Sequence, residues 1–148
     1  MSYHEPPVFR ILVAVDFSAH ARLALEWALR LAKAMNGRLV LLHVIDIFSL
    51  AQASCRMVGT DYLGILRDDA SRGMDELQKL VPEAERFIRE GSPRPLIIDT
   101  AVELNCQMIV MGTHGRSGLA HLLLGSVAEY VVRHSQIPVL TAHCPKPQ

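Results

Sequence analysis

The sequence predicts a doubly wound α/β domain, in which a five-stranded parallel sheet carries helices on both faces. Five short strand-like segments alternate along the chain with segments whose apolar residues recur at helical spacing. The first two are nearly continuous in Val, Ile and Leu, as is typical of strands buried on both faces of a parallel sheet. The length of 148 residues fits one domain, and we expect residues 1–7 and 143–148 to be flexible tails.

A β-α-β unit is expected at the start of the chain. The first strand is predicted at Val8–Val15, and a helix follows that begins after Ser18 and is closed by Asn36 and Gly37. The second strand, Arg38–Ile45, repeats the apolar pattern of the first. Because a helical crossover joins the two strands, they should pair in parallel.

The middle of the chain carries a weaker signal. Residues Ile47–Gly64 show no clear apolar period and are expected to form a loop. Apolar residues at helical spacing then predict a helix from Leu63 that stops near Pro82. A short strand, Ala84–Glu90, is mostly charged, which indicates a position near the edge of the sheet.

The last third of the chain is expected to complete the alternation. A helix with Pro95 in its first turn precedes a fourth strand at Gln107–Met111. The last helix is predicted at Val127–His134 and the fifth strand at Ile137–Ala142. Pro138 limits this strand to an edge of the sheet, because proline has no N–H to donate to a ladder.

Composition and charge exclude several classes of protein. Fifteen Lys and Arg balance fifteen Asp and Glu, so no overall positive charge attracts nucleic acid or an anionic membrane. The start of the chain lacks a signal-peptide pattern, and no apolar run approaches the roughly 18 residues of a membrane span. Three cysteines without a C-x-x-C pair indicate neither a disulfide framework nor a thiolate zinc site. We therefore expect a cytoplasmic protein with no nucleic-acid or membrane partner.

A glycine-punctuated segment after the fourth strand is the strongest functional signal. Gly112-Thr113-His114-Gly115 is followed nine residues later by Gly125-Ser126, which opens the last helix. Glycine lets backbone N–H groups approach an anion closely, and free amides at a helix start favour negative charge. Arg116 adds a guanidinium that can bind phosphate oxygens in a forked geometry. The segment therefore predicts a phosphate-binding loop.

Several polar residues also have a purely structural interpretation. Ser126 and Glu129 have the spacing of a capping box, which would satisfy the amides of the last helix internally. Asp16 is either a turn residue or a ligand contact at the end of the first strand. His114 is either a solvated loop residue or an acid or base beside a phosphate. His43, within an apolar strand, is expected to be a hydrogen-bonded core histidine.

Five short motifs along the chain form a recognisable set. They are Ala14–Ser18, His43-Val44, Met111–Gly118, Leu124–Ala128 and Pro138–Leu140. Together they resemble the motifs of the universal stress protein family, from about Val8 to Ala142, and the glycine motif resembles that of its ATP-binding branch. The resemblance implies a Rossmann-like sheet with the strand order 3-2-1-4-5, in which the ends of the first and fourth strands face one crevice.

The resemblance also implies a site for ATP, with or without Mg²⁺, or for another adenine nucleotide. Asp16 and the main chain of Val44 would contact the adenosine, while the phosphates would lie near the glycine motif. The implied binding residues are Ala14, Val15, Asp16, Val44, Met111, Gly112, Gly115, Arg116, Gly125, Ser126 and Val127. The family usually dimerises through its last strand, which implies a homodimer through the C-terminal edge strand.

Three classes of function fit these observations. We favour a nucleotide-binding stress-response or signalling module, whose bound ATP stabilises one conformation or dimer arrangement. The alternatives are a weak ATP hydrolase or adenylate-transferring enzyme, and a non-catalytic dimeric scaffold. The chain contains neither the P-loop lysine motif nor a G-x-G-x-x-G after its first strand, which argues against a P-loop NTPase and a dinucleotide enzyme. No catalytic or metal-ligating residue is assigned, and the protein partner is not predicted.

Overall fold

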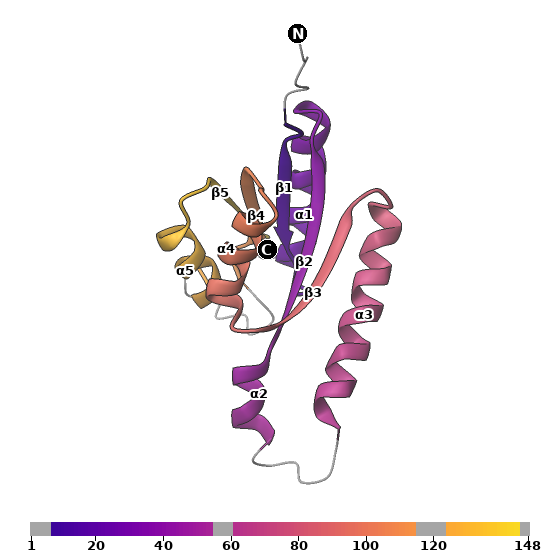
Figure 1. The fold of residues 1–148 in the computed structure, drawn as a ribbon, viewed down its shortest axis with the longest axis vertical. Helices are drawn as coiled ribbons and strands as arrows, with labels where there is room; N and C mark the ends of the chain where they lie inside the picture. Colours follow the sequence, from indigo (N-terminus) through magenta and orange to yellow (C-terminus); the bar gives the residue numbers. More distant parts are fainter. Residues whose placement is uncertain (1–6, 55–60, 115–123, 146–148) are drawn as a thin grey trace.

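The computed structural model describes residues 7–54, 61–114 and 124–145, and these residues form an all-parallel sheet covered by helices (Figure 1). The strands are β1 (Arg10–Ala14), β2 (Arg38–Asp46), β3 (Glu85–Gly91), β4 (Met108–Gly112) and β5 (Val139–Ala142). The helices are α1 (Ala19–Ala34), α2 (Ile47–Ser54), α3 (Tyr62–Leu80), α4 (Pro93–Glu103) and α5 (Ser126–His134). The strand order is β3-β2-β1-β4-β5, so the predicted doubly wound fold and its strand order are confirmed. No helix within the described ranges has the length and apolarity to cross a membrane.

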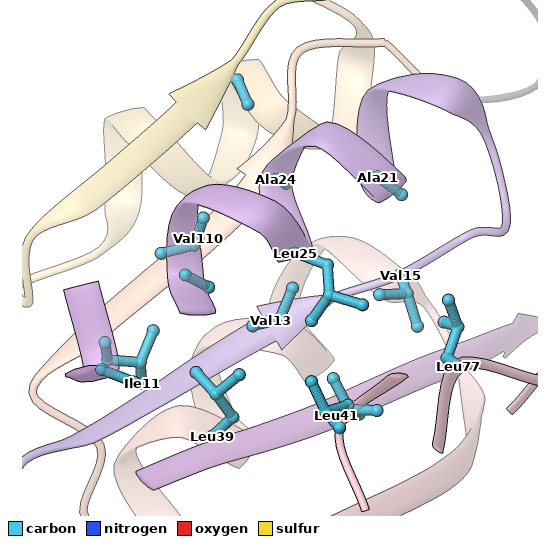
Figure 2. Close-up of a cluster of buried hydrophobic side chains, with 14 of the residues drawn as sticks. Ile11, Val13, Val15, Ala21, Ala24, Leu25, Leu39, Leu41, Leu77 and Val110 are labelled. Atoms are coloured by element: carbon cyan, nitrogen blue, oxygen red, sulfur yellow. The ribbon is translucent and has the colours of Figure 1, made fainter. Parts of the chain in front are cut away.

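Two apolar layers pack on opposite faces of this sheet. Ile11 and Val13 of β1 point into a layer formed with α1 and α3, which Figure 2 shows with Val110 of β4. Leu12, between them in sequence, points into the other layer with Ala101 of α4 and residues of α5. Successive residues of a strand face opposite sides, so a strand covered on both faces needs apolar residues at every position. This requirement explains the continuous apolar runs.

Local hydrogen bonds set both ends of α1. Ser18 is the N-cap, and its hydroxyl oxygen accepts from the Ala21 N–H at 3.2 Å, as expected. At the other end Asn36 has a φ of 50°, and the Gly37 N–H donates to the Ala32 carbonyl at 2.8 Å. This is a Schellman motif, in which Asn36 provides the left-handed residue. Gly37 serves a different purpose, because a Cβ there would lie 2.6 Å from the carbonyl oxygen of Phe9.

The prediction of a loop at Ile47–Gly64 is wrong at both ends of this segment, where the structure has helices. Its first residues form α2, because the Asp46 carboxylate accepts from the N–H groups of Phe48 and Ser49, both at 3.1 Å. Its last residues begin α3, whose N-cap is Asp61. Residues 55–60 lie outside the described part of the chain. α2 lacks an apolar period because it covers little of the core, and Phe48 remains 64% exposed.

The edges of the sheet agree with the sequence prediction. β3 and β5 are the outer strands, as the charges of β3 and Pro138 before β5 indicated. α4 begins at Pro93, two residues before Pro95, because Ser92 is its N-cap. Figure 1 shows α4 and α5 on one side of the strands and α3 on the other. The first two crossovers, through α1 and α3, therefore lie on one face and the last two, through α4 and α5, on the other. The direction of winding reverses between β1 and β4.

Candidate functional site

A cleft of about 360 Å³ opens where β1, β2 and β4 end, beside the first turn of α5. Its volume lies within the range of small-molecule sites, roughly 300–1,000 Å³. The ends of β1 and β4 lie side by side there, with Ala14 paired to Met111. In an open parallel sheet, ligands bind at this reversal point, outside the carboxyl ends of the strands. The cleft is therefore the candidate functional site.

Most of the predicted binding residues lie around this one cleft. Those that line it are Ala14, Val15, Asp16, Val44, Met111, Gly112, Gly125, Ser126 and Val127. The other two, Gly115 and Arg116, lie outside the described residues. The nine described residues come from three strands and one helix, so the fold brings together positions that are far apart in sequence. Their part in binding a nucleotide stays a prediction.

The first turn of α5 offers backbone donors to the cleft. Gly125 is the N-cap and its N–H donates to the Thr113 carbonyl at 2.6 Å, but no side chain caps the helix. The next three amides, of residues 126–128, have no hydrogen-bond acceptor among the described residues. Free amides and the helix dipole together make such a turn a site for an anion.

The capping box, which was the structural alternative for the start of α5, does not form. Ser126 is the first residue of the helix and not its N-cap, so its hydroxyl is not in the capping position. Glu129 forms an ion pair with Arg133, one turn further along the helix. The two side chains that would have satisfied the first amides therefore do not do so. This removes the main structural alternative for the Gly125-Ser126 motif.

The turn after β1 holds Asp16 at the rim of the cleft. Asp16 Oδ1 accepts from the Ser18 N–H at 3.0 Å, so the interpretation of Asp16 as a turn residue is correct. Asp16 also lines the cleft, so the interpretation as a ligand contact stays open. Phe17, between Asp16 and Ser18, has a φ of 65°. This backbone conformation strains a bulky residue, and such strained residues cluster at functional sites. The ring of Phe17 lies 4.5 Å from that of His43 and fixes the turn.

The end of β2 presents main-chain groups to the cleft. The Leu42 carbonyl accepts from the Val15 N–H at 2.8 Å, and β1 ends at this level. Alternate residues of a strand direct their backbone groups to the same side, so those of Val44 point the same way, beyond β1. His43 Nδ1–H donates to the Val15 carbonyl at 2.7 Å, so the expected hydrogen bond is confirmed. The side chain is half-buried and lines the cleft, so His43 is not a core residue. These contacts leave the main chain of Val44 facing the cleft.

Gly112 has a packing function that the sequence analysis did not identify. A Cβ at this position would lie 2.6 Å from the Cβ of His20 and 2.8 Å from its carbonyl carbon. Real Cβ contacts are not this short, so a side chain would force α1 away from the end of β4. The glycine therefore lets the start of α1 approach the sheet at the cleft.

Three histidines gather at one side of the cleft. The Nδ1 atoms of His20, His114 and His143 lie 3.3, 3.0 and 3.0 Å from the hydroxyl oxygen of Thr113. The side chain of His114 is buried, so the interpretation of His114 as a solvated loop residue is wrong.

The surroundings of His20 lower its pKa. Burial lowers this pKa most, and the neighbouring His114 and His143 lower it further, while Asp16 opposes the shift. The backbone N–H of Cys144 donates to His20 Nδ1 at 3.0 Å, so the chain is hydrogen-bonded beyond β5.

Some residues of the cleft were not predicted. Asp46, Pro93, Ile97 and Thr113 line it together with the predicted set. Asp46 ends β2 and Pro93 begins the helix after β3, so both occupy the carboxyl side of the sheet. The rule that ligands bind outside the carboxyl ends of parallel strands would have found them. No sequence signal identified Ile97, which is a buried core residue of α4.

Comparisons with known proteins agree with this architecture. The model of the universal stress protein family matches residues 8–143. Universal stress protein MJ0577 of Methanocaldococcus jannaschii is 30% identical over 149 residues, covering 88% of this chain and 92% of the relative. The solved structure of MJ0577 has a TM-score of 0.81 at 29% identity, covering 93% of this chain and 97% of the other. A universal stress protein solved in complex with cAMP has a TM-score of 0.59 at 26% identity, covering 91% of this chain and 96% of the other.

Replacing Gly112 with Ala tests the packing function of this glycine. The added methyl group meets backbone atoms of α1, which cannot rotate away, so we expect Gly112→Ala to lower the free energy of unfolding by about 1–3 kcal/mol. Urea denaturation followed by circular dichroism measures the change. A variant as stable as the wild type would mean that α1 does not approach β4 this closely.

Proposed function

Since this chain belongs to the universal stress protein family, we propose that it binds an adenine nucleotide, ATP, in the cleft described above. The bound nucleotide would act as a signal in a stress response, by stabilising one conformation of a cytoplasmic protein. The observation that carries the proposal is the set of amides at residues 126–128, which line the cleft and have no acceptor among the described residues. Such donors match the needs of a polyphosphate.

The two ends of the cleft suit the two parts of a nucleotide. The main chain of Val44 offers a donor and an acceptor for the edge of an adenine ring, between apolar residues such as Ala14 and Ile97. The phosphates would lie at the first turn of α5, where the dipole favours negative charge. A relative of 26% identity has been solved with cAMP, an adenine nucleotide, which supports this class of ligand.

Asp16 is the carboxylate best suited to a nucleotide-bound Mg²⁺. Mg²⁺ in nucleotide sites is commonly held by one or two carboxylates together with phosphate oxygens. Both oxygens of Asp46 are occupied, since Oδ1 accepts from two amides of α2 and Oδ2 accepts from the Ser49 hydroxyl at 2.6 Å. Asp16 Oδ1 accepts a hydrogen bond within its turn, and Asp16 Oδ2 accepts none from the described residues. We propose that Asp16 contributes to Mg²⁺ binding when ATP is present.

A homodimer through β5 is the second part of the proposal. The carbonyls of Pro138 and Ala142 accept from Ile109 and Thr113 N–H groups, both at 2.9 Å. Backbone groups alternate along a strand, so those of Thr141 point away from β4. β5 is an outer strand, and such an edge is a template for pairing with another chain. A second copy of this chain is the proposed partner at that edge.

A charge at the first turn of α5 tests the phosphate site. Ser126 is exposed, and Ser126→Glu places a carboxylate where a helix tolerates it well. We expect the fold to persist and the affinity for ATP to fall at least about tenfold, because the carboxylate repels the phosphates. Isothermal titration calorimetry measures the affinity and circular dichroism measures the fold, and Ser126→Gln is the control of equal size without charge.

Adenosine is the control ligand that tests binding at the adenine end of the cleft alone. It lacks phosphates, so its affinity should be the same for wild type and Ser126→Glu. Absence of any ATP binding by the wild-type protein at millimolar concentration would overturn the proposed function. Equal ATP affinity of wild type and Ser126→Glu would instead show that the phosphates bind elsewhere.

Removing one outward N–H of β5 tests the homodimer. Thr141→Pro deletes a donor on the side away from β4, so we expect the dimer to dissociate while the sheet remains intact. Thr141→Val is the control, because it keeps the N–H and nearly the same volume. Sedimentation equilibrium over a range of concentrations measures the mass. A wild-type chain that stays monomeric, or a dimeric proline variant, would contradict the proposal.

A further inference from the structure

Three histidines from separate parts of the chain form a cluster beside the cleft. His20 lies in the first turn of α1, His114 follows β4 and His143 follows β5. One ring nitrogen from each lies within 4.8 Å of the other two. The ring centroids are 5.3 to 5.8 Å apart and the ring planes are inclined by 47° to 62°, so the rings are tilted toward one another and do not stack.

The backbone of the fold builds this cluster. β4 and β5 pair in parallel up to Gly112 and Ala142, and the Thr113 N–H donates to the Ala142 carbonyl at 2.9 Å. The residues that follow the two strands are therefore held side by side. The missing side chain at Gly112 lets His20 approach from α1. The positions of the histidines are thus set by rigid elements, as a binding site requires.

We propose that His20, His114 and His143 bind one divalent transition-metal ion with the preferences of Zn²⁺. Imidazole nitrogen is a preferred ligand of zinc, copper and nickel, whereas Mg²⁺ prefers oxygen. Three protein ligands and one open position are common in zinc sites that also bind water or substrate. The site is separate from the oxygen ligands at Asp16, and it does not depend on nucleotide binding.

The spacing of the histidines is close to what such an ion needs. Tetrahedral zinc with Zn–N distances of 2.0–2.1 Å brings two ligand nitrogens to about 3.4 Å from each other. The nitrogens of the cluster lie within 4.8 Å of one another, so side-chain rotation must bring them closer together to reach this geometry. His143 is exposed and His20 is half-buried, so both can rotate. His114 is buried and would be the fixed ligand.

Existing hydrogen bonds hold the rings in the metal-free protein. The Thr113 hydroxyl lies within 3.3 Å of Nδ1 in all three rings, and the Cys144 N–H donates to His20 Nδ1. A hydroxyl has one hydrogen to donate, so it serves one of these nitrogens as a donor and accepts from others. Metal binding would replace these bonds by coordination bonds. The Thr113 and Cys144 contacts thus pre-orient the three rings.

Metal titration of the full-length chain without an affinity tag tests the proposal. Zn²⁺ is added in isothermal titration calorimetry, and Co²⁺ is followed by the visible absorption of its low-symmetry complex. We expect one ion per chain without nucleotide. His20→Gln and His143→Gln should each weaken binding at least about tenfold. His134→Gln is the matched control, because His134 lies in the last turn of α5 and bonds to the Tyr130 carbonyl.

Two results would overturn the metal site. The first is a wild-type protein, folded by circular dichroism, that binds neither ion at a hundred micromolar. The second is unchanged affinity in His20→Gln and His143→Gln, which would mean that other histidines hold the ion. Because the titration contains no nucleotide, either failure leaves the proposed ATP site untouched. Failure of ATP to bind likewise leaves the metal measurement valid.

Discussion

The backbone donors at the start of α5 are the constraint on which the proposed site depends. Every helix begins with amides that have no partner inside the helix, and a half-buried amide without an acceptor costs free energy. In α5 neither Ser126 nor Glu129 supplies that acceptor, and Gly125 has no side chain to do so. No acceptor for these amides lies among the described residues, so they are available to water or to a ligand. An anion is the preferred occupant, because the helix dipole adds to the hydrogen bonds.

The rest of the fold brings other groups to these donors. The reversal of winding between β1 and β4 opens the sheet at the point where α5 begins. The Gly125 N–H, bonded to the Thr113 carbonyl at 2.6 Å, fixes the first turn of α5 to the end of β4. Asp16 and the main chain of Val44 face the same cleft from β1 and β2. A strained Phe17 between β1 and α1 holds the turn that carries Asp16.

The sequence predicted those features that depend on repeating patterns. Continuous apolar runs identified the buried strands, and the Gly125-Ser126 pair identified the start of α5. The short helix α2 was missed because Asp46 caps it locally while its own residues contact little of the core. The histidine cluster was missed because its members lie in α1, after β4 and after β5, which only the folded sheet brings together. The capping-box alternative placed the N-cap at Ser126, whereas the backbone conformation makes Gly125 the N-cap, one residue earlier.

The most direct test of the phosphate site is an NMR titration of the ¹⁵N-labelled protein with ATP, compared with adenosine. Amides that bind the phosphates should shift with ATP and stay nearly unchanged with adenosine, and these should be the amides of residues 126–128. The amide of Val44 should shift with both ligands, since it lies at the adenine end of the cleft. Amides of residues 126–128 that remain unshifted while ATP binds would contradict the account, because the phosphates would then have other partners.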